Sequence, residues 1–210
     1  DSDLTQSNSP SGSLLFDDTA EEISYEPNNA FILGRDDFTV EVIANVSNSR
    51  SNQTFFDAGG DVNDGESFAF WIEGNQLKIR RDGINDISTS MQSEWLNSFH
   101  HYAAVRGIGM FRIFVDGNLV VEGSDHNFSI NRDAPVVGQL NNFRDSYAFS
   151  GSIRNIRVVK GTALYSSNFT APVSPLSKVS GTLLLLLAQN PANPTYDSSD
   201  NHWVPKVSST

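Results

Sequence analysis

The amino-acid sequence predicts an all-β protein, built as a sandwich or a barrel, on three observations. Short segments alternate apolar and polar residues, which is typical of strands with one buried face. Residues that favour tight hairpins separate several of these segments, as at 73–75, 82–83 and 116–118. No window of about 11 residues has a convincing helical period. The expected strands, in chain order, lie at 14–16, 38–44, 68–73, 76–81, 101–106, 111–115, 119–122, 135–137, 153–159 and 183–187.

The individual strands follow from their residues. In 68–73 the apolar side chains Phe68, Phe70 and Ile72 fall on one face, and 76–81 alternates in the same way. The five leucines of 183–187 indicate a strand that is buried on both faces. The other large aromatic residues, Phe99 and Phe169 among them, are expected in the core.

Composition and charge exclude several classes of protein. Hydrophobic residues make up 38% of the chain and charged residues 19%, so the chain can fill a core and is not a highly charged disordered protein. It has no cysteine, which excludes disulfides, cysteine zinc sites and a cysteine nucleophile. A formal net charge of −11 argues against a nucleic-acid partner, because phosphate repels it. The longest apolar run, 183–188, is far short of the ~20 residues of a membrane span.

The expected domain organisation is simple. Residues 1–13 are polar and rich in breakers, and they indicate a leader or linker. A single domain is expected over 14–203, followed by a tail at 204–210. Tyr196 and Trp203 lie in a Pro/Asn/Ser-rich segment, and we expect this segment to pack against the body of the domain.

Several motifs resemble those of laminin-G-like and pentraxin-like modules. Trp95, HYAAVR at 101–106 and FRIFVDG at 111–117 are similar to the central motif of these modules, and 36–41 and 149–158 to two of their strands. Residues 159–172 resemble the ending typical of such modules in bacteriophage virion proteins. The resemblance implies the concanavalin A-like lectin/glucanase superfamily and its antiparallel two-sheet jelly-roll β-sandwich.

One element departs from the usual order. The DSSDN sequence at 197–201 resembles a motif that opens the module in many relatives, whereas here it closes the chain. A closed sandwich tolerates this change if its ends meet in space. We therefore expect 14–16 and 183–187 to be neighbours, both central in one sheet.

The resemblance implies a set of functions, because this fold hosts lectins, adhesion modules, decoration proteins and glycanases. We expect a non-catalytic, lectin-like module on a virion surface that binds a bacterial surface polysaccharide. The alternative is a structural protein that decorates a capsid or tail and contacts other virion proteins. A glycan hydrolase is the third reading. The oligomeric state stays open, a homo-oligomer included.

Catalytic signatures are weak. The glycanases of this superfamily have acidic residues that alternate along one strand, and this chain has no such run. Asp37 and Glu41 are expected to be charges at a strand edge. His100 and His101 are adjacent and therefore point to opposite faces, and no Ser-His-Asp triad can be assembled from the sequence. These observations favour a protein that is not an enzyme.

Alternation predicts a polar and aromatic outer face on which a glycan could lie. Aromatic rings stack on the CH groups of sugars, and guanidinium groups bind hydroxyls or carboxylates. Arg157 joins this face if a bulge lies near 153–156. In the alternative interpretation, long loops or another subunit cover Trp71 and Phe114, and no groove exists. The candidate glycan-binding residues are Trp71, Lys78, Arg80, His100, Tyr102, Arg106, Arg112 and Phe114.

One acidic run is a candidate calcium site. It holds hard oxygen donors around glycines, which calcium prefers, although its spacing is not that of an EF-hand. The candidate ligands are Asp57, Asp61, Asn63, Asp64 and Glu66. Two further candidates are Asn141–Asn142 with Asp145, and Asp17 or Asp18 with Asp197. The alternative is a solvated acidic turn. No cofactor other than calcium is expected.

Overall fold

The computed structural model describes most of the chain. The described residues are 5–6, 12–17, 21–47, 51–59, 67–80, 87–126, 129–140, 146–172, 175–189 and 193–208.

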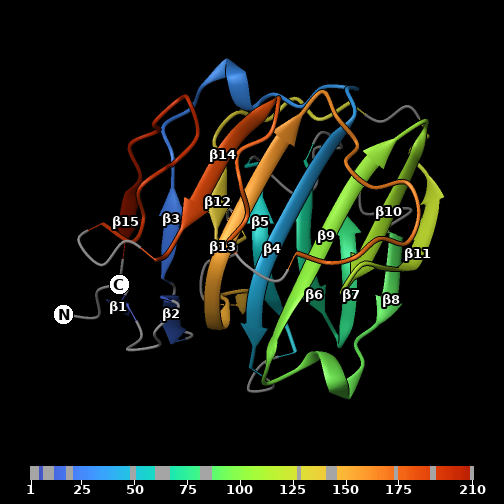
Figure 1. The fold of residues 1–210 in the computed structure, drawn as a ribbon, viewed down its shortest axis with the longest axis horizontal. Helices are drawn as coiled ribbons and strands as arrows, with labels where there is room; N and C mark the ends of the chain where they lie inside the picture. Colours follow the sequence, from blue (N-terminus) through green and yellow to red (C-terminus); the bar gives the residue numbers. More distant parts are fainter. Residues whose placement is uncertain are drawn as a thin grey trace.

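Two antiparallel sheets pack face to face, as Figure 1 shows, and the predicted all-β sandwich is confirmed. The eight-stranded sheet has the order β1-β2-β13-β4-β9-β10-β11, with β14 also paired to β13. Its strands are β1 (Thr5–Gln6), β2 (Leu14–Asp17), β4 (Phe38–Val46), β9 (Phe99–Gly107), β10 (Met110–Val115), β11 (Asn118–Ser124), β13 (Ser150–Lys160) and β14 (Thr182–Leu187). The seven-stranded sheet has the order β15-β3-β12-β5-β6-β7-β8. Its strands are β3 (Glu22–Ser24), β5 (Gln53–Asp57), β6 (Ala69–Glu73), β7 (Gln76–Arg80), β8 (Ile87–Ser90), β12 (Val136–Val137) and β15 (Lys206–Ser208).

The structure also contains two short 3-10 turns, η1 (Asn29–Phe31) and η2 (Ser93–Trp95). No helix in the described part of the chain is long and apolar enough to cross a membrane.

The core lies between the sheets and is rich in phenylalanine. Phe38 of β4 meets Phe68 edge to face, with ring centroids 4.9 Å apart, and Phe55 of β5 stacks on Tyr102 of β9 at 5.0 Å. Such aromatic pairs add to the free energy gained by burying their area. The predicted turns at 73–75 and 116–118 connect hairpins, and Asn75 and Asp116 have positive φ angles there. The predicted turn at 82–83 lies outside the described residues.

Strand β13 organises the eight-stranded sheet. It pairs with β4 along its length on one side, and with β2 and then β14 on the other. Residues 14–16 and 183–187, expected to be neighbours, therefore lie one after the other along the same side of β13 and do not pair with each other. The expectation that both are central is wrong, since β14 pairs only with β13. The register of β13 against β4 shifts between Ile153 and Asn155, which is the bulge that the sequence suggested.

The DSSDN sequence ties the C-terminal segment to β14. The carboxylate of the fully buried Asp197 accepts hydrogen bonds from the backbone N–H groups of Leu185, Ser199 and Trp203, at 2.9, 3.0 and 2.9 Å. The indole of Trp203 donates to the Leu183 carbonyl at 2.9 Å and packs on Phe31. These bonds occupy the oxygens that the proposed pairing with Asp17 would offer to calcium, so Asp197 has a structural role here.

Candidate functional site

The candidate glycan-binding residues lie on two different sheets. Trp71 and Lys78 belong to β6 and β7 of the seven-stranded sheet, whereas the candidates from His100 to Phe114 belong to β9 and β10 of the other sheet. The side chain of Arg80 lies outside the described residues. The prediction of a single outer face made by all eight residues is therefore wrong.

Two of the candidates point into the sandwich. Tyr102 is fully buried in the main core, and Arg106 is buried in an ion pair with Asp125, with nitrogen and oxygen 2.7 Å apart. The guanidinium of Arg106 also lies over the Phe111 ring, at 5.5 Å from its centroid. The predicted orientation of these two residues is wrong because both faces of β9 are apolar, so the alternation does not show which face is inside.

The outward-facing aromatic candidates are covered by other parts of the chain. Trp71 packs under Leu140 and Tyr147, with the two rings 5.1 Å apart. Phe114 packs under Tyr165 and Phe169, at 6.1 and 5.4 Å. This is the alternative in which loops cover these side chains. Phe169, expected in the core, is instead part of that cover.

The basic candidates on the outside form ion pairs. Lys78 pairs with Glu73 at 2.9 Å, and Arg112 pairs with Glu122 at 3.1 Å. Of the eight candidates, His100 alone lines the main pocket described below.

The calcium candidates lie almost entirely outside the described residues. These are Asp61, Asn63, Asp64 and Glu66, as well as Asp18, Asn141, Asn142 and Asp145 of the other two proposals. Asp57 is fully buried at the end of β5, and its carboxylate accepts a hydrogen bond from the Gly59 N–H at 2.9 Å. No group of three acidic or histidine residues among the described residues is arranged to hold a metal ion.

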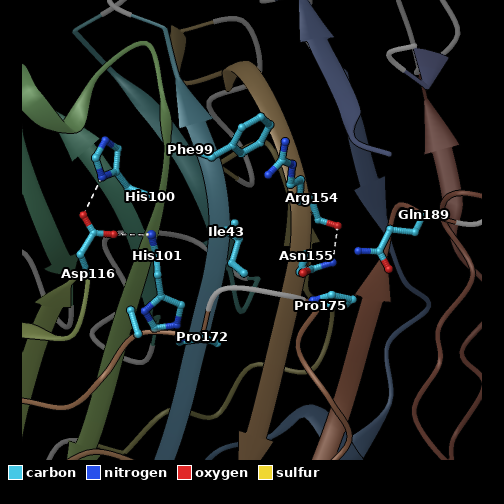
Figure 2. Close-up of a pocket in the computed structure, with 11 residues that line it drawn as sticks. Ile43, Phe99, His100, His101, Asp116, Arg154, Asn155, Pro172, Pro175 and Gln189 are labelled. Atoms are coloured by element: carbon cyan, nitrogen blue, oxygen red, sulfur yellow. Dashed lines mark hydrogen bonds and ion pairs between the residues drawn. The ribbon is translucent and has the colours of Figure 1, made fainter. Parts of the chain in front are cut away.

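A pocket of about 350 Å³ opens on the outer face of the eight-stranded sheet; we call it the outer-sheet pocket. Strands β4, β9 and β13 form its floor, and Ala171, Pro172 and Pro175 form a wall (Figure 2). It combines apolar surface with several hydrogen-bonding side chains, as pockets for small polar ligands do. Its lining residues are Ile43, Phe99, His100, His101, Asp116, Arg154, Asn155, Ala171, Pro172, Pro175 and Gln189.

Arg154 sits at the bulge of β13 and lies against Phe99. Its guanidinium carbon is 3.7 Å from the centre of the Phe99 ring, which makes a close cation–π contact. The Arg154 Nε is buried without a hydrogen-bond partner, and no carboxylate among the described residues forms an ion pair with this side chain. Phe99, expected in the core, instead lines the outer-sheet pocket.

Ser98, His100 and Asp116 form a chain of hydrogen bonds at one edge of the pocket. The Ser98 hydroxyl lies 2.7 Å from His100 Nε2, and His100 Nδ1 lies 2.6 Å from Asp116 Oδ2. With Asp116 ionised, Nδ1 donates to it and Nε2 accepts from Ser98. Asp116 Oδ1 accepts from the His101 N–H at 3.0 Å. This triad-like order could not be predicted from the sequence, because Asp116 lies at the end of a different strand from Ser98 and His100.

A buried polar cluster lies beside the pocket. It anchors the segment that covers β9 and β10, which includes Ala163, Tyr165 and Phe169. Glu41 Oε1 accepts from Arg157, at 2.8 Å from Nε, and Oε2 accepts from His101 Nε2 at 2.7 Å and from the Tyr165 hydroxyl at 2.9 Å. The prediction that Glu41 is an exposed strand-edge charge is wrong, since it is fully buried. Arg157 is the register partner of Glu41 on β13, whereas His101 lies on the same face of β9, two residues from the register partner Ala103.

The cluster determines the ionisation of its members. Burial alone would raise the pKa of Glu41, but the hydrogen bond from His101 and the charge of Arg157 outweigh it and hold the pKa below the ordinary value of 4.5. Burial, followed by the charge of Glu41, raises the pKa of Tyr165. Glu41 is therefore a carboxylate and Tyr165 a neutral hydroxyl donor at neutral pH.

A second, smaller pocket of about 260 Å³ adjoins the first, and Gln189 lines both. Its other lining residues are Leu187, Tyr196 and Ser198. The Tyr196 ring is 41% exposed and stacks on the imidazole of His202, to which its hydroxyl is also hydrogen-bonded at 2.9 Å. This neighbour fixes the orientation of an exposed aromatic ring.

Comparison with known proteins agrees with the fold. A laminin G-like family model, described as the concanavalin A-like lectin/glucanases superfamily, matches residues 18–166. No curated protein sequence matches the chain.

Three solved structures illustrate the shared architecture. A candidate carbohydrate-binding protein from Bacteroides ovatus has a TM-score of 0.66 at 15% identity, over 99% of this chain and 60% of that one. The CBM40 module of a Ruminococcus gnavus sialidase, bound to α2,3-sialyllactose, has a TM-score of 0.56 at 14% identity, over 78% and 95%. The enzymatically active domain of tailspike protein 2 of bacteriophage CBA120 has a TM-score of 0.59 at 14% identity, over 88% of this chain and 32% of that one. At these identities the likeness establishes the fold.

Proposed function

Because the chain belongs to the concanavalin A-like lectin/glucanases superfamily, we propose that it is a lectin-like module that binds a glycan without cleaving it. The observation on which this rests is the outer-sheet pocket, which combines the Phe99 ring and two prolines with imidazole, guanidinium and amide groups. Sugars present CH faces and hydroxyl edges, and this mixture of side chains is complementary to both.

The solved relatives support the proposal. One is a carbohydrate-binding module of a sialidase bound to a sialylated sugar, and this chain spans 95% of its length. Another is described as a candidate carbohydrate-binding protein. Carbohydrate binding thus occurs on this architecture, although the residues that bind must be found in each protein separately.

We propose further that the glycan is a bacterial surface polysaccharide and that the module acts at the surface of a virion. The support is the resemblance of residues 159–172 to phage modules and the fold shared with a phage tailspike domain. The alternative remains a structural virion protein that acts through subunit contacts. Burial of Trp71 and Phe114 does not favour it, because segments of this same chain cover both rings.

The test is a titration of the purified chain with bacterial surface polysaccharides, beside the variant Ala171→Trp. Ala171 lines the pocket, so an indole there would fill it, whereas Ser167→Trp places the same group on an exposed part of the same segment. We expect wild type and Ser167→Trp to bind one glycan class and Ala171→Trp to lose at least about tenfold in affinity. Equal binding by all three folded proteins would contradict the proposed site.

A calcium site at 57–66 stays a proposal. Asp57 belongs to β5 of the seven-stranded sheet, whereas the outer-sheet pocket lies on the other sheet. We therefore expect a chelator to leave glycan binding unchanged, and an increase in Tm on adding calcium would support the site.

One observation favours a second candidate function, an ester hydrolase. Ser98, His100 and Asp116 have the hydrogen-bond order of a catalytic triad, in which a serine attacks and histidine takes its proton. A hydrolase also needs N–H donors for the developing oxyanion. Incubation with acetylated polysaccharide tests it: we expect no acetate release above that of the Ser98→Ala variant, and release that depends on Ser98 would contradict a non-catalytic role.

A further inference from the structure

We propose that the outer-sheet pocket selects an acidic sugar, whose carboxylate binds the guanidinium of Arg154. This inference rests on the proposed glycan-binding function and specifies its ligand class. It starts from a charge that the fold leaves without a counterion inside a pocket.

Arg154 differs from the other pocket-side and core arginines in its partners. Arg106 pairs with Asp125, Arg112 with Glu122 and Arg157 with Glu41, at 2.7, 3.1 and 2.5 Å. Arg154 forms no such pair with any residue that the structure describes, and its Nε is a buried donor without an acceptor. An anion bound at the guanidinium would supply the counterion that the described residues do not provide.

The geometry prepares the guanidinium for a planar ligand group. The guanidinium carbon lies 3.7 Å from the centre of the Phe99 ring, and this contact restrains the group. A guanidinium presents its N–H groups in a planar fork that can make two parallel hydrogen bonds. The Arg154 carbonyl accepts hydrogen bonds from Ala188 N at 3.0 Å and Asn155 Nδ2 at 2.6 Å, so the backbone at the bulge is also held. Carboxylates form such paired hydrogen bonds with arginine, and the pair is stronger than a single hydrogen bond.

The one carboxylate that lines the pocket does not prevent this. Asp116 lies across the pocket from Arg154 (Figure 2), and its oxygens accept hydrogen bonds from His100 Nδ1 and His101 N. Gln189 lies on the Arg154 side and offers its amide to a hydroxyl of the same sugar, whereas the amide of the buried Asn155 is already bonded to the Arg154 carbonyl and the Leu176 N–H. An acidic sugar can therefore place its carboxylate at Arg154 and a hydroxyl toward Gln189.

The variant Arg154→Gln tests the proposal, since it removes the charge at similar length. Arg35→Gln is the matched control, because Arg35 is exposed and lies outside the pocket. The probes are bacterial polysaccharides that contain uronic or sialic acids, the same polysaccharides after chemical reduction of their carboxyl groups, and sulfated dextran.

We expect wild type and Arg35→Gln to bind a carboxylated polysaccharide at least about tenfold more tightly than its reduced form, and Arg154→Gln to lose that preference. The preference should weaken as salt rises, since the ion pair is partly open to solvent. Tighter binding to sulfated dextran than to the carboxylated probe would overturn the proposed carboxylate ligand and indicate a sulfate in its place.

The outcomes separate the two levels of the proposal. If the affinity is the same for the carboxylated and the reduced polysaccharide, or is unchanged in Arg154→Gln, the proposal of an acidic ligand is overturned. The proposal of glycan binding then remains. Failure of the folded wild type to bind any polysaccharide overturns both.

Discussion

Glu41 shows how a single buried charge supports the outer face of the eight-stranded sheet. Its two oxygens accept from an arginine, a histidine and a tyrosine, and the tyrosine belongs to the segment that covers β9 and β10. A buried carboxylate is tolerated only where such partners replace water. The cluster therefore fixes this segment, which continues into the wall of the outer-sheet pocket.

The variant Glu41→Gln tests this role. Arg157 would remain buried without a counterion, so we expect the free energy of unfolding at pH 7 to fall by about 3–5 kcal/mol. The pKa of Glu41 is lower in the folded protein than in the unfolded chain, so its contribution is present above pH 4.5 and is lost as the pH falls through the folded pKa.

Urea unfolding of both proteins between pH 7 and pH 3 measures the effect. The two stabilities should converge at the acid end. A constant difference across this range would mean that the ionisation of Glu41 does not contribute.

Strand β14 and the segment that follows it extend the candidate site to the second pocket. Gln189 follows β14 and lines both pockets, and Tyr196 is held beside the second pocket by His202. Asp197 in turn fastens this segment to β14. An exposed ring in a fixed orientation is a suitable stacking surface for a sugar that neighbours the one in the first pocket.

We therefore expect affinity to increase from a monosaccharide to an oligosaccharide of the same repeat. Tyr196→Ala should reduce oligosaccharide affinity about threefold to tenfold and leave monosaccharide affinity unchanged, because aromatic stacking contributes about 1 kcal/mol. Val204→Ala, at a position that is 82% exposed, is the control.

Calorimetric titration with both ligands measures this difference. If Tyr196→Ala weakens both ligands equally, the second pocket is not a separate subsite. If it weakens neither, the ligand does not reach Tyr196.

For the whole molecule, period-two alternation and hairpin residues were enough to predict the sandwich. They were not enough to orient β9, because a segment of the chain covers the outer face of its sheet and makes that face apolar as well. Ala103 and Val105 face this cover, while Tyr102 fills the core. When both faces of a strand are buried, the sequence does not show which alternate set of residues faces the core.

The candidate site was less predictable than the fold. His100 was among the predicted residues, but Arg154, Asn155 and Gln189 were not. Arg154 owes its position to a bulge, and Gln189 reaches the pocket only because β14 pairs with β13. These residues come together through the pairing of strands that are distant in the sequence. The spacing of residues along a single strand carries no information about that pairing.

The most direct test of glycan binding in the outer-sheet pocket is the affinity of the folded chain for a bacterial polysaccharide, measured beside Ala171→Trp and Ser167→Trp. Saturable binding by wild type and Ser167→Trp, reduced at least about tenfold in Ala171→Trp, is the predicted result. Unchanged affinity in Ala171→Trp, or no binding by the folded wild type to any polysaccharide, would contradict it.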